Sequence, residues 1–125
     1  MNKDIIAQNA ACNAIVGLVD AGTANPAGRL LIYNDSSTVL AWLPFGNPAF
    51  QDSTDGTSVS NPLTDSTALA DGTASWFGVF DRDSTRIWRG SVVQTGHVGD
   101  MRLAQTILHT DMTVSITQAT YVVPS

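Results

Sequence analysis

The chain has 125 residues, of which 43% are hydrophobic and 14% charged, and its formal net charge is −5 at pH 7. One domain of this length buries about two-thirds of the surface of its unfolded chain, so a core can form without disulfides or metals. The acidic balance and the scatter of the six Lys and Arg residues argue against nucleic acid as a partner, and the single cysteine, Cys12, excludes an internal disulfide.

Residues 3–20 are predicted to form the only helix, with Asn2 as the N-cap and Gly22 just past the end. At about 100° per residue, apolar side chains share one face, from which Asn13 and Ala10 point away. The members of this face are Ile5, Cys12, Ile15, Val16 and Val19. We expect the helix to dock through it. The N-terminus lacks the apolar core of a secretory signal, and no stretch approaches the roughly 20 apolar residues of a membrane span.

After a turn at residues 23–28, the chain reads as strands. The first two are predicted at Arg29–Tyr33 and Val39–Phe45, on either side of a Ser/Asn/Asp turn. Phe50 is expected to anchor the polar loop that follows. Pro62 is expected to prevent a continuous strand between residues 56 and 69.

A hairpin is predicted between Gly72 and Val93, with its turn at residues 82–84. Both arms carry large apolar side chains on both faces. We expect Trp76 and Phe80 to lie in the core and Trp88 to be partly exposed, because Arg86 and Gly90 on the face of Trp88 fill a core poorly. The remaining apolar face should be covered by the helix or by a partner.

The last strands are predicted at 101–108 and 113–123, and the second of these has the cleanest alternation in the chain. Six to eight short strands indicate a mainly β fold: a single antiparallel β-sandwich of jelly-roll or immunoglobulin-like type, or a small barrel, with one N-terminal α-helix. Residues 1–22 then form an amphipathic helix, part of the domain or an assembly arm, and residues 23–125 form the β-sandwich.

The sequence from Asp81 to Thr85 resembles the DxDxT element of haloacid-dehalogenase-like phosphatases, in which the first Asp is a nucleophile. Those enzymes need a parallel sheet with crossover helices, and no helix is predicted after residue 22. A turn is favoured instead, in which Asp and Ser side chains accept hydrogen bonds from nearby backbone N–H groups and Arg86 and Arg89 screen the carboxylates. With no G-x-S-x-G element either, we expect no enzymatic activity.

Metal binding has little support in the spacing of the candidate ligands. Calcium needs six to eight oxygen ligands, and the aspartates do not have EF-hand spacing. The two histidines, His97 and His109, have neither a His nor a Cys partner at zinc-site spacing. We expect no metal, no cofactor and no small-molecule substrate. The aspartates considered are Asp52, Asp55, Asp65, Asp71, Asp81, Asp83 and Asp100.

Three roles are considered for the aromatic side chains. They could pack in the core, which their place in alternating strands favours; they could stack on sugars, as in β-sandwich carbohydrate-binding modules; or they could form a protein interface, where Trp and Tyr are enriched. Trp88 is the first candidate for an interface. The aromatic residues considered are Trp42, Trp76, Phe77, Phe80, Trp88 and Tyr121.

Five segments together resemble small structural proteins of tailed bacteriophages. Such proteins have an N-terminal helix, an LxIY strand, a strand ending in F-x-N/D-P-A-F, a G-T-A-x-W-F hairpin and a final T-V-S-I-T strand. The matching segments are AACNAIVGLVDAG, GRLLIYN, VLAWLPFGNPAFQ, DGTASWFGVFDRDSTRIWRGSVV and DMTVSITQATYVV.

The resemblance implies a non-enzymatic virion protein, a head decoration or cement protein that self-associates as a trimer and clamps neighbouring subunits of the major capsid protein. It would be made in the host cytoplasm and carried on the capsid surface, with no nucleic-acid or membrane partner. The alternatives are a tail or connector subunit and a carbohydrate-binding module. The residues expected at interfaces are Ile5, Ile15, Val19, Trp42, Phe45, Trp88 and Tyr121.

Overall fold

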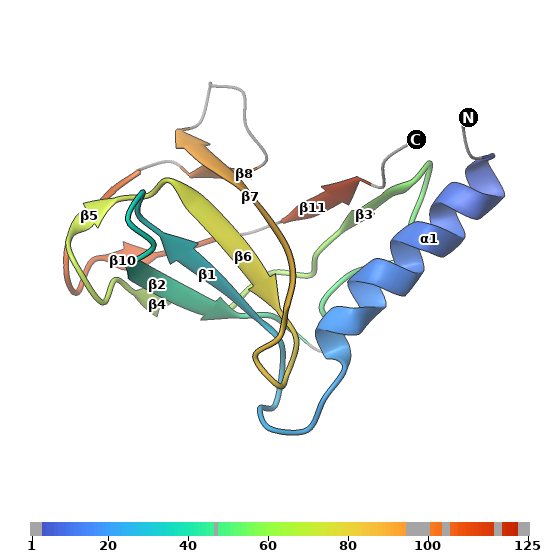
Figure 1. Ribbon diagram of the computed structural model, residues 1–125, viewed down its shortest axis with the longest axis horizontal. Helices are drawn as coiled ribbons and strands as arrows, with labels where there is room; N and C mark the ends of the chain where they lie inside the picture. Colours follow the sequence, from blue (N-terminus) through green and yellow to red (C-terminus); the bar gives the residue numbers. More distant parts are fainter. Residues whose placement is uncertain (1–3, 47, 95–100, 104–105, 117–118, 123–125) are drawn as a thin grey trace.

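The protein is mainly β, with one N-terminal α-helix, as the sequence predicts (Figure 1). The structure, a computed structural model, describes residues 4–46, 48–94, 101–103, 106–116 and 119–122. Helix α1 (Ile5–Gly17) continues into a short 3₁₀ helix, η1 (Leu18–Asp20). The N-cap is Asp4, so the expectation of Asn2 was wrong, and Gln8 N–H donates to the Asp4 carbonyl at 2.8 Å.

Four strands form an antiparallel sheet in the order β2-β1-β6-β7, and a fifth, β8, pairs with β7 in parallel. The expectation of purely antiparallel pairing was wrong for this one pair. The strands are β1 (Arg29–Tyr33), β2 (Val39–Pro44), β6 (Trp76–Phe80), β7 (Arg86–Gln94) and β8 (Met101–Leu103).

Three short antiparallel ladders accompany this main sheet. They are β3 (Thr57–Val59) with β11 (Thr120–Val122), β4 (Ser66–Thr67) with β10 (Thr113–Val114), and β5 (Gly72–Thr73) with β9 (Ile107–Leu108). The strand expected over 113–123 is thus divided. Pro62 interrupts the opposite segment, so β10 pairs on one side of this break and β11 on the other.

Side chains alternate between the two faces of the main sheet. Leu30 and Ile32 of β1 lie opposite Val79 and Phe77 of β6, and all four are buried. Trp76 and Phe80 therefore point to the other face, where they are only partly buried. The expectation that these two residues lie in the core was wrong.

The inner face of the main sheet and the ladders contribute to one hydrophobic cluster. Phe50 belongs to it: its ring lies 5.5 Å from that of Phe45 and 5.6 Å from that of Trp88, measured between centroids. Its predicted role as the anchor of a polar loop is confirmed. Leu108 of β9 and Val114 of β10 also belong to the cluster, and the segments next to the ladder strands add Leu63, Ile116 and Ala119.

Helix α1 packs on its own chain, against β3 and β11 (Figure 1). Cys12 and Val16 of α1 and Val19 of η1 are the buried residues of this segment. The Cys12 thiol lies 3.8 Å from the Tyr121 carbonyl oxygen, to which it donates a hydrogen bond. In the part of the chain described, neither helix is long and apolar enough to cross a bilayer.

Gly28 is predicted to be intolerant of any side chain. A Cβ at this position would lie 2.5 Å from Val19 Cγ1 and 2.7 Å from the Phe80 carbonyl oxygen, where the end of η1 meets the sheet. Gly28→Ala should lower the free energy of unfolding by about 1–3 kcal/mol in urea denaturation.

Gly17→Ala is the matched control, since nothing lies within 4 Å of a Cβ there. It should stabilise the protein by up to about 1 kcal/mol, as alanine is the better helix former. Equal effects of the two substitutions would contradict this account of the packing.

Candidate interaction surfaces

A β-bulge in β7 decides which side chains share the face of Trp88. The pairing register shifts so that Trp88 lies opposite Val79 and Arg86 opposite Phe80, which leaves Ile87 as the extra residue. Trp88 consequently faces inward, and its ring lies 4.7 Å from that of Tyr121. The prediction that Trp88 is partly exposed is confirmed. Its assignment to one face with Arg86 was wrong, because the bulge turns Arg86 to the opposite side.

The outer face of the main sheet combines aromatic rings with arginines. The rings of Tyr33 and Trp76 stack with centroids 3.9 Å apart and an interplanar angle of 9°. The Cζ atoms of Arg89 and Arg86 lie 4.7 and 5.7 Å from the centroid of Trp76, within the range of cation–π attraction. Burial raises the pKa of Tyr33, and the charge of Arg86 opposes this rise.

A second pair extends the same face. The Cζ atom of Arg29 on β1 lies 5.6 Å from the ring centroid of Trp42 on β2, which is 37% exposed. We call this surface the arginine–aromatic face. It comprises Arg29, Tyr33, Trp42, Trp76, Arg86 and Arg89.

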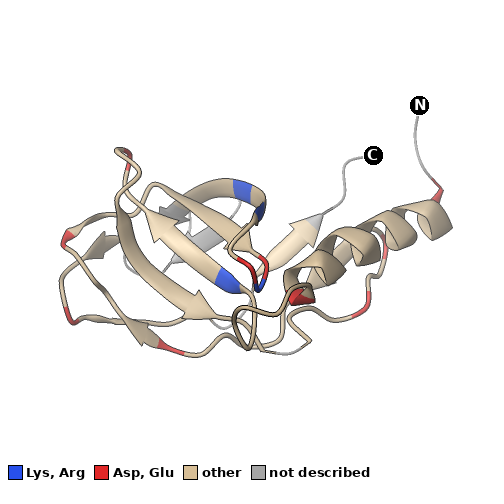
Figure 2. Cartoon of the chain, turned by 60° about the horizontal axis from the view of Figure 1, so that its bottom comes forward, with Lys and Arg blue, Asp and Glu red and all other residues tan. Residues whose placement is uncertain are grey.

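Charge is unevenly distributed over the molecule. Among the described residues, Figure 2 shows basic positions in the middle of the molecule, whereas acidic positions extend to both ends of the long axis. The strands β1, β2, β6 and β7 contain no Asp or Glu. Arginines that are scattered along the sequence thus gather in space on a sheet without carboxylates.

An apolar pocket of about 350 Å³ opens beside Trp42. Pro26, Arg29, Pro44 and Phe45 contribute to its walls. The Nε atom of Arg29 is buried and has no hydrogen-bond partner among the described atoms, while another nitrogen of the same guanidinium donates to the Ser84 hydroxyl. The pocket is therefore lined by the exposed ring of Trp42 and by the guanidinium group of Arg29, whose Nε donor is unused among the described atoms.

The side of α1 that meets the protein carries polar as well as apolar side chains. Asn9 Oδ1 accepts from Gly56 N–H at 2.8 Å, and Asn13 Oδ1 accepts from Ser53 N–H at 2.9 Å. Asp20 continues the pattern by accepting from Ala49 N–H at 3.1 Å. The expectation that Asn13 lies away from the docking face was wrong, because it binds the loop beneath the helix.

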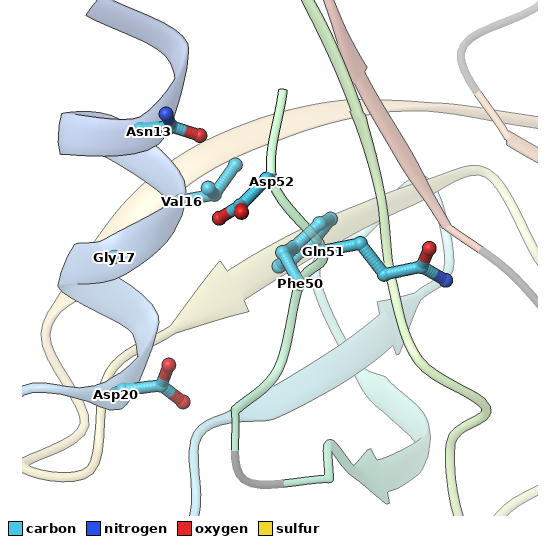
Figure 3. Close-up of a pocket in the computed structure, with 7 residues that line it drawn as sticks. All are labelled: Asn13, Val16, Gly17, Asp20, Phe50, Gln51 and Asp52. Carbon is cyan, nitrogen blue, oxygen red and sulfur yellow. The ribbon is translucent and has the colours of Figure 1, made fainter. Parts of the chain in front are cut away.

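Figure 3 shows the crevice between α1 and this loop, where Asn13, Val16 and Asp20 face Phe50 and Asp52. Its volume is about 220 Å³. Among the described residues, no three His, Cys, Asp or Glu side chains gather in a way that could hold a metal ion. His97 and Asp100, two of the ligands considered, lie outside the described residues.

The opposite side of α1 is exposed and uncharged. Ile6 is 85% exposed and Leu18 48%. We call this the helix surface, and its other exposed members are small: Ala7, Ala10, Ala14 and Gly17. The usual pattern of a surface helix, apolar inside and polar outside, is thus partly inverted.

Asp81 and Asp83 organise the hairpin turn. Asp81 Oδ1 accepts from the N–H groups of Asp83 and Thr85 at 2.9 Å each, which confirms the predicted turn. Asp83 Oδ1 accepts from the N–H groups of Thr23 and Ala24, also at 2.9 Å. Arg86 and Arg89 lie over Trp76, so the expectation that they screen these carboxylates was wrong.

The residues expected at interfaces have different environments. Val19 and Phe45 are buried in the core of their own chain, so neither offers its side chain to a partner. Ile15, Trp88 and Tyr121 are partly buried, whereas Ile5 is 50% exposed and Trp42 37%. Trp42 is the only one of the seven that belongs to the arginine–aromatic face.

Sequence reasoning missed most of both surfaces. The stacking of Tyr33 on Trp76 was not predicted, although both side chains lie on the outer face of the main sheet. Ile6 and Leu18 fall off the helical face that the periodicity defines, and large apolar residues in that position were the available signal.

Comparison with known proteins adds no family: no protein-family model, no curated protein and no solved structure matches the chain.

The double substitution Asn9→Ala and Asn13→Ala tests the polar docking of α1. It should lower the free energy of unfolding by about 1–2 kcal/mol, since Gly56 and Ser53 lose hydrogen-bond acceptors. Alanine is the better helix former, so a helix held by apolar contacts alone would become more stable. An unchanged or raised stability in chemical denaturation would contradict the docking role.

Asp83 should contribute to acid sensitivity. The hydrogen bonds from Thr23 and Ala24 hold the pKa of Asp83 below its ordinary value. A lowered folded-state pKa gives stability that is present above the unfolded-state value, about 3.9, and is lost as the pH falls through the lowered value. Asp83→Asn should flatten the fall of stability with pH below about 4, measured by denaturation at several pH values. Parallel curves for the two proteins would refute this role.

Proposed function

We propose that the protein is a non-enzymatic structural subunit of a tailed-bacteriophage virion, a capsid decoration protein that self-associates as a trimer and clamps neighbouring capsid subunits. The observation that carries this proposal is that one small chain has two uncovered surfaces on different elements, one apolar and one that combines aromatic rings with arginines. They are the helix surface and the arginine–aromatic face. A subunit held between two neighbours needs two contact surfaces. The resemblance of five segments to phage structural proteins is the reason for proposing a virion as the assembly.

The helix surface suits a permanent contact. Its exposed members have no charge, so burying them against another protein removes no charged group from water. Ile6 and Leu18 supply the large apolar side chains, and the alanines between them allow close approach. Each such contact is small, but symmetry repeats it in an assembly and raises the net strength of binding.

The architecture in this proposal is a β-sandwich. The main sheet would be one layer, and the three short ladders would be strands of the second. The single hydrophobic cluster to which both contribute supports this arrangement.

A tail or connector subunit is the alternative within the same class. Rings need the same pair of surfaces, because each subunit contacts two neighbours. Cryo-electron microscopy of the particle distinguishes the two: copies on the icosahedral shell indicate a head protein, and stacked rings indicate a tail protein.

A carbohydrate-binding module is the alternative from another class, and the observation that favours it is the pocket beside Trp42. Trp88 packs against Phe50 and Tyr121, so Trp42 is the ring available for stacking on a sugar. Glycan-array binding that is lost in Trp42→Ala and kept in Trp88→Phe would favour this module.

The decoration role is tested with capsids that lack the protein. They should lose their contents at lower temperature or in chelator, and added wild-type protein should restore resistance. Ile6→Lys with Leu18→Lys should fail to restore it, because two charges then interrupt the helix surface. Gln51→Lys with Thr54→Lys, which adds the same two charges at other exposed positions, should restore it. Capsids that keep full resistance without the protein would refute the clamping role.

A further inference from the structure

We propose that the arginine–aromatic face binds the acidic end of a second copy of the same chain, in a head-to-tail contact. The acidic end consists of strand β9 and two adjacent loops, and it carries Leu69, Asp71, Ile107 and Asp111. This inference rests on the proposed function and names the two surfaces through which the subunits would associate.

The acidic end is held together by hydrogen bonds between its two loops. The N–H and hydroxyl of Thr110 donate to Asp71 Oδ1 at 2.7 and 3.0 Å, and Asp111 N–H donates to the Ala68 carbonyl at 2.9 Å. These bonds from Thr110 hold the pKa of Asp71 below its ordinary value, so this carboxylate stays charged at mildly acidic pH. The end is therefore a defined structure with fixed negative charge.

Apolar side chains flank those carboxylates. Leu69 is 54% exposed and Ile107 52%, although each is large enough to be expected in a core. Ile107 lies opposite Thr73 on the neighbouring strand, next to the pair formed by Gly72 and Leu108. The acidic end thus combines two exposed aliphatic side chains with two aspartates.

The arginine–aromatic face offers the complementary chemistry. Arg29, Arg86 and Arg89 lie over tryptophan rings, which orients their guanidinium groups, and the strands that carry them contain no carboxylate. Arg29 Nε also lacks a partner among the described atoms. The pocket of about 350 Å³ beside Trp42 can receive an aliphatic side chain. Arginine then meets aspartate, and Leu69 or Ile107 meets tryptophan.

Overall charge favours this orientation over others. Two copies that each carry a net charge of −5 repel one another on average, and a contact that places the basic region of one against an acidic region of the next offsets this repulsion. Because the two surfaces differ, the contact is heterologous. Repetition of a heterologous contact closes a ring, such as a trimer, or extends a filament.

Two charge-changing variants test the contact by analytical ultracentrifugation of the full chain. Arg86→Glu with Arg89→Glu makes the face acidic, and Leu69→Lys with Ile107→Lys and Asp111→Asn makes the end basic, because the two lysines then outweigh the one remaining carboxylate, Asp71. Each variant alone should associate at least about tenfold more weakly than the wild type. An equimolar mixture should recover association, because an acidic face then meets a basic end.

Gln51→Lys with Thr54→Lys is the matched control, since it adds two lysines at exposed positions outside both surfaces. It should associate like the wild type. Wild-type association should also weaken as salt is raised, because exposed charge pairs are screened. Circular dichroism and thermal unfolding of each variant confirm that it folds.

Wild-type affinity in either charge-changing variant, or no recovery in the mixture, would overturn the head-to-tail contact. If Ile6→Lys with Leu18→Lys dissociates the protein while the charge-changing variants do not, self-association uses the helix surface and only this inference fails. A wild-type protein that is monomeric at every concentration overturns it as well. Binding of that monomer to capsids would leave the clamping role standing without the trimer, and absence of such binding would refute both proposals.

Discussion

The register between β1 and β6 is the constraint on which the two faces of the protein depend. Ile32 lies opposite Phe77 and Leu30 opposite Val79, so the buried residues of both strands point to one side. A slip of β1 by one residue would turn Arg29 and Tyr33 toward the core and expose Leu30 and Ile32. The same register places Tyr33 directly opposite Trp76, where the two rings stack. Core formation and the arginine–aromatic face are therefore consequences of one pairing.

A single extra residue in β7 completes that face. The bulge at Ile87 lets Trp88 remain opposite Val79 on the inner side, while Arg86 joins Arg89 on the outer side. Without the bulge, alternation would place Arg86 on the inner face of the sheet, together with Trp88. The bulge thus keeps a charged group out of the core and adds a second cation above Trp76.

Helix α1 partly reverses the usual pattern of a surface helix, although Cys12 and Val16 are buried against the protein. Its Asn side chains accept hydrogen bonds from the backbone of the loop beneath it, and its outward positions are apolar. Backbone N–H groups in an irregular loop have no ladder to join, so they need side-chain acceptors. Asn9 and Asn13 of the helix accept hydrogen bonds from two of these loop N–H groups. The outer side of the helix is uncharged and carries Ile6 and Leu18, which supports the proposed role in an assembly.

By itself, the sequence determined the class and the local elements. It predicted one helix at the start, strands at Arg29–Tyr33 and on both sides of the turn at Asp81, the break at Pro62 and the anchoring of Phe50, because these depend on short-range patterns of polarity and turn residues. Tertiary structure alone decided which face of each strand is inside. The hairpin carries aromatic residues on both faces, and only its pairing with β1 decides which face lies against the core.

The functional surfaces depended on the tertiary structure in the same way. Arg29 and Trp42 lie on different strands. Arg86 and Arg89 on β7 reach Trp76 on β6 through the pairing of these strands, and Arg86 does so because of the bulge. Asn13 is predicted from the periodicity to lie away from the docking face, and only the fold brings the loop at 53–56 within hydrogen-bonding distance of it. Periodicity describes one element at a time, whereas these contacts join elements that are distant in sequence, and the register that joins them is a property of the whole fold.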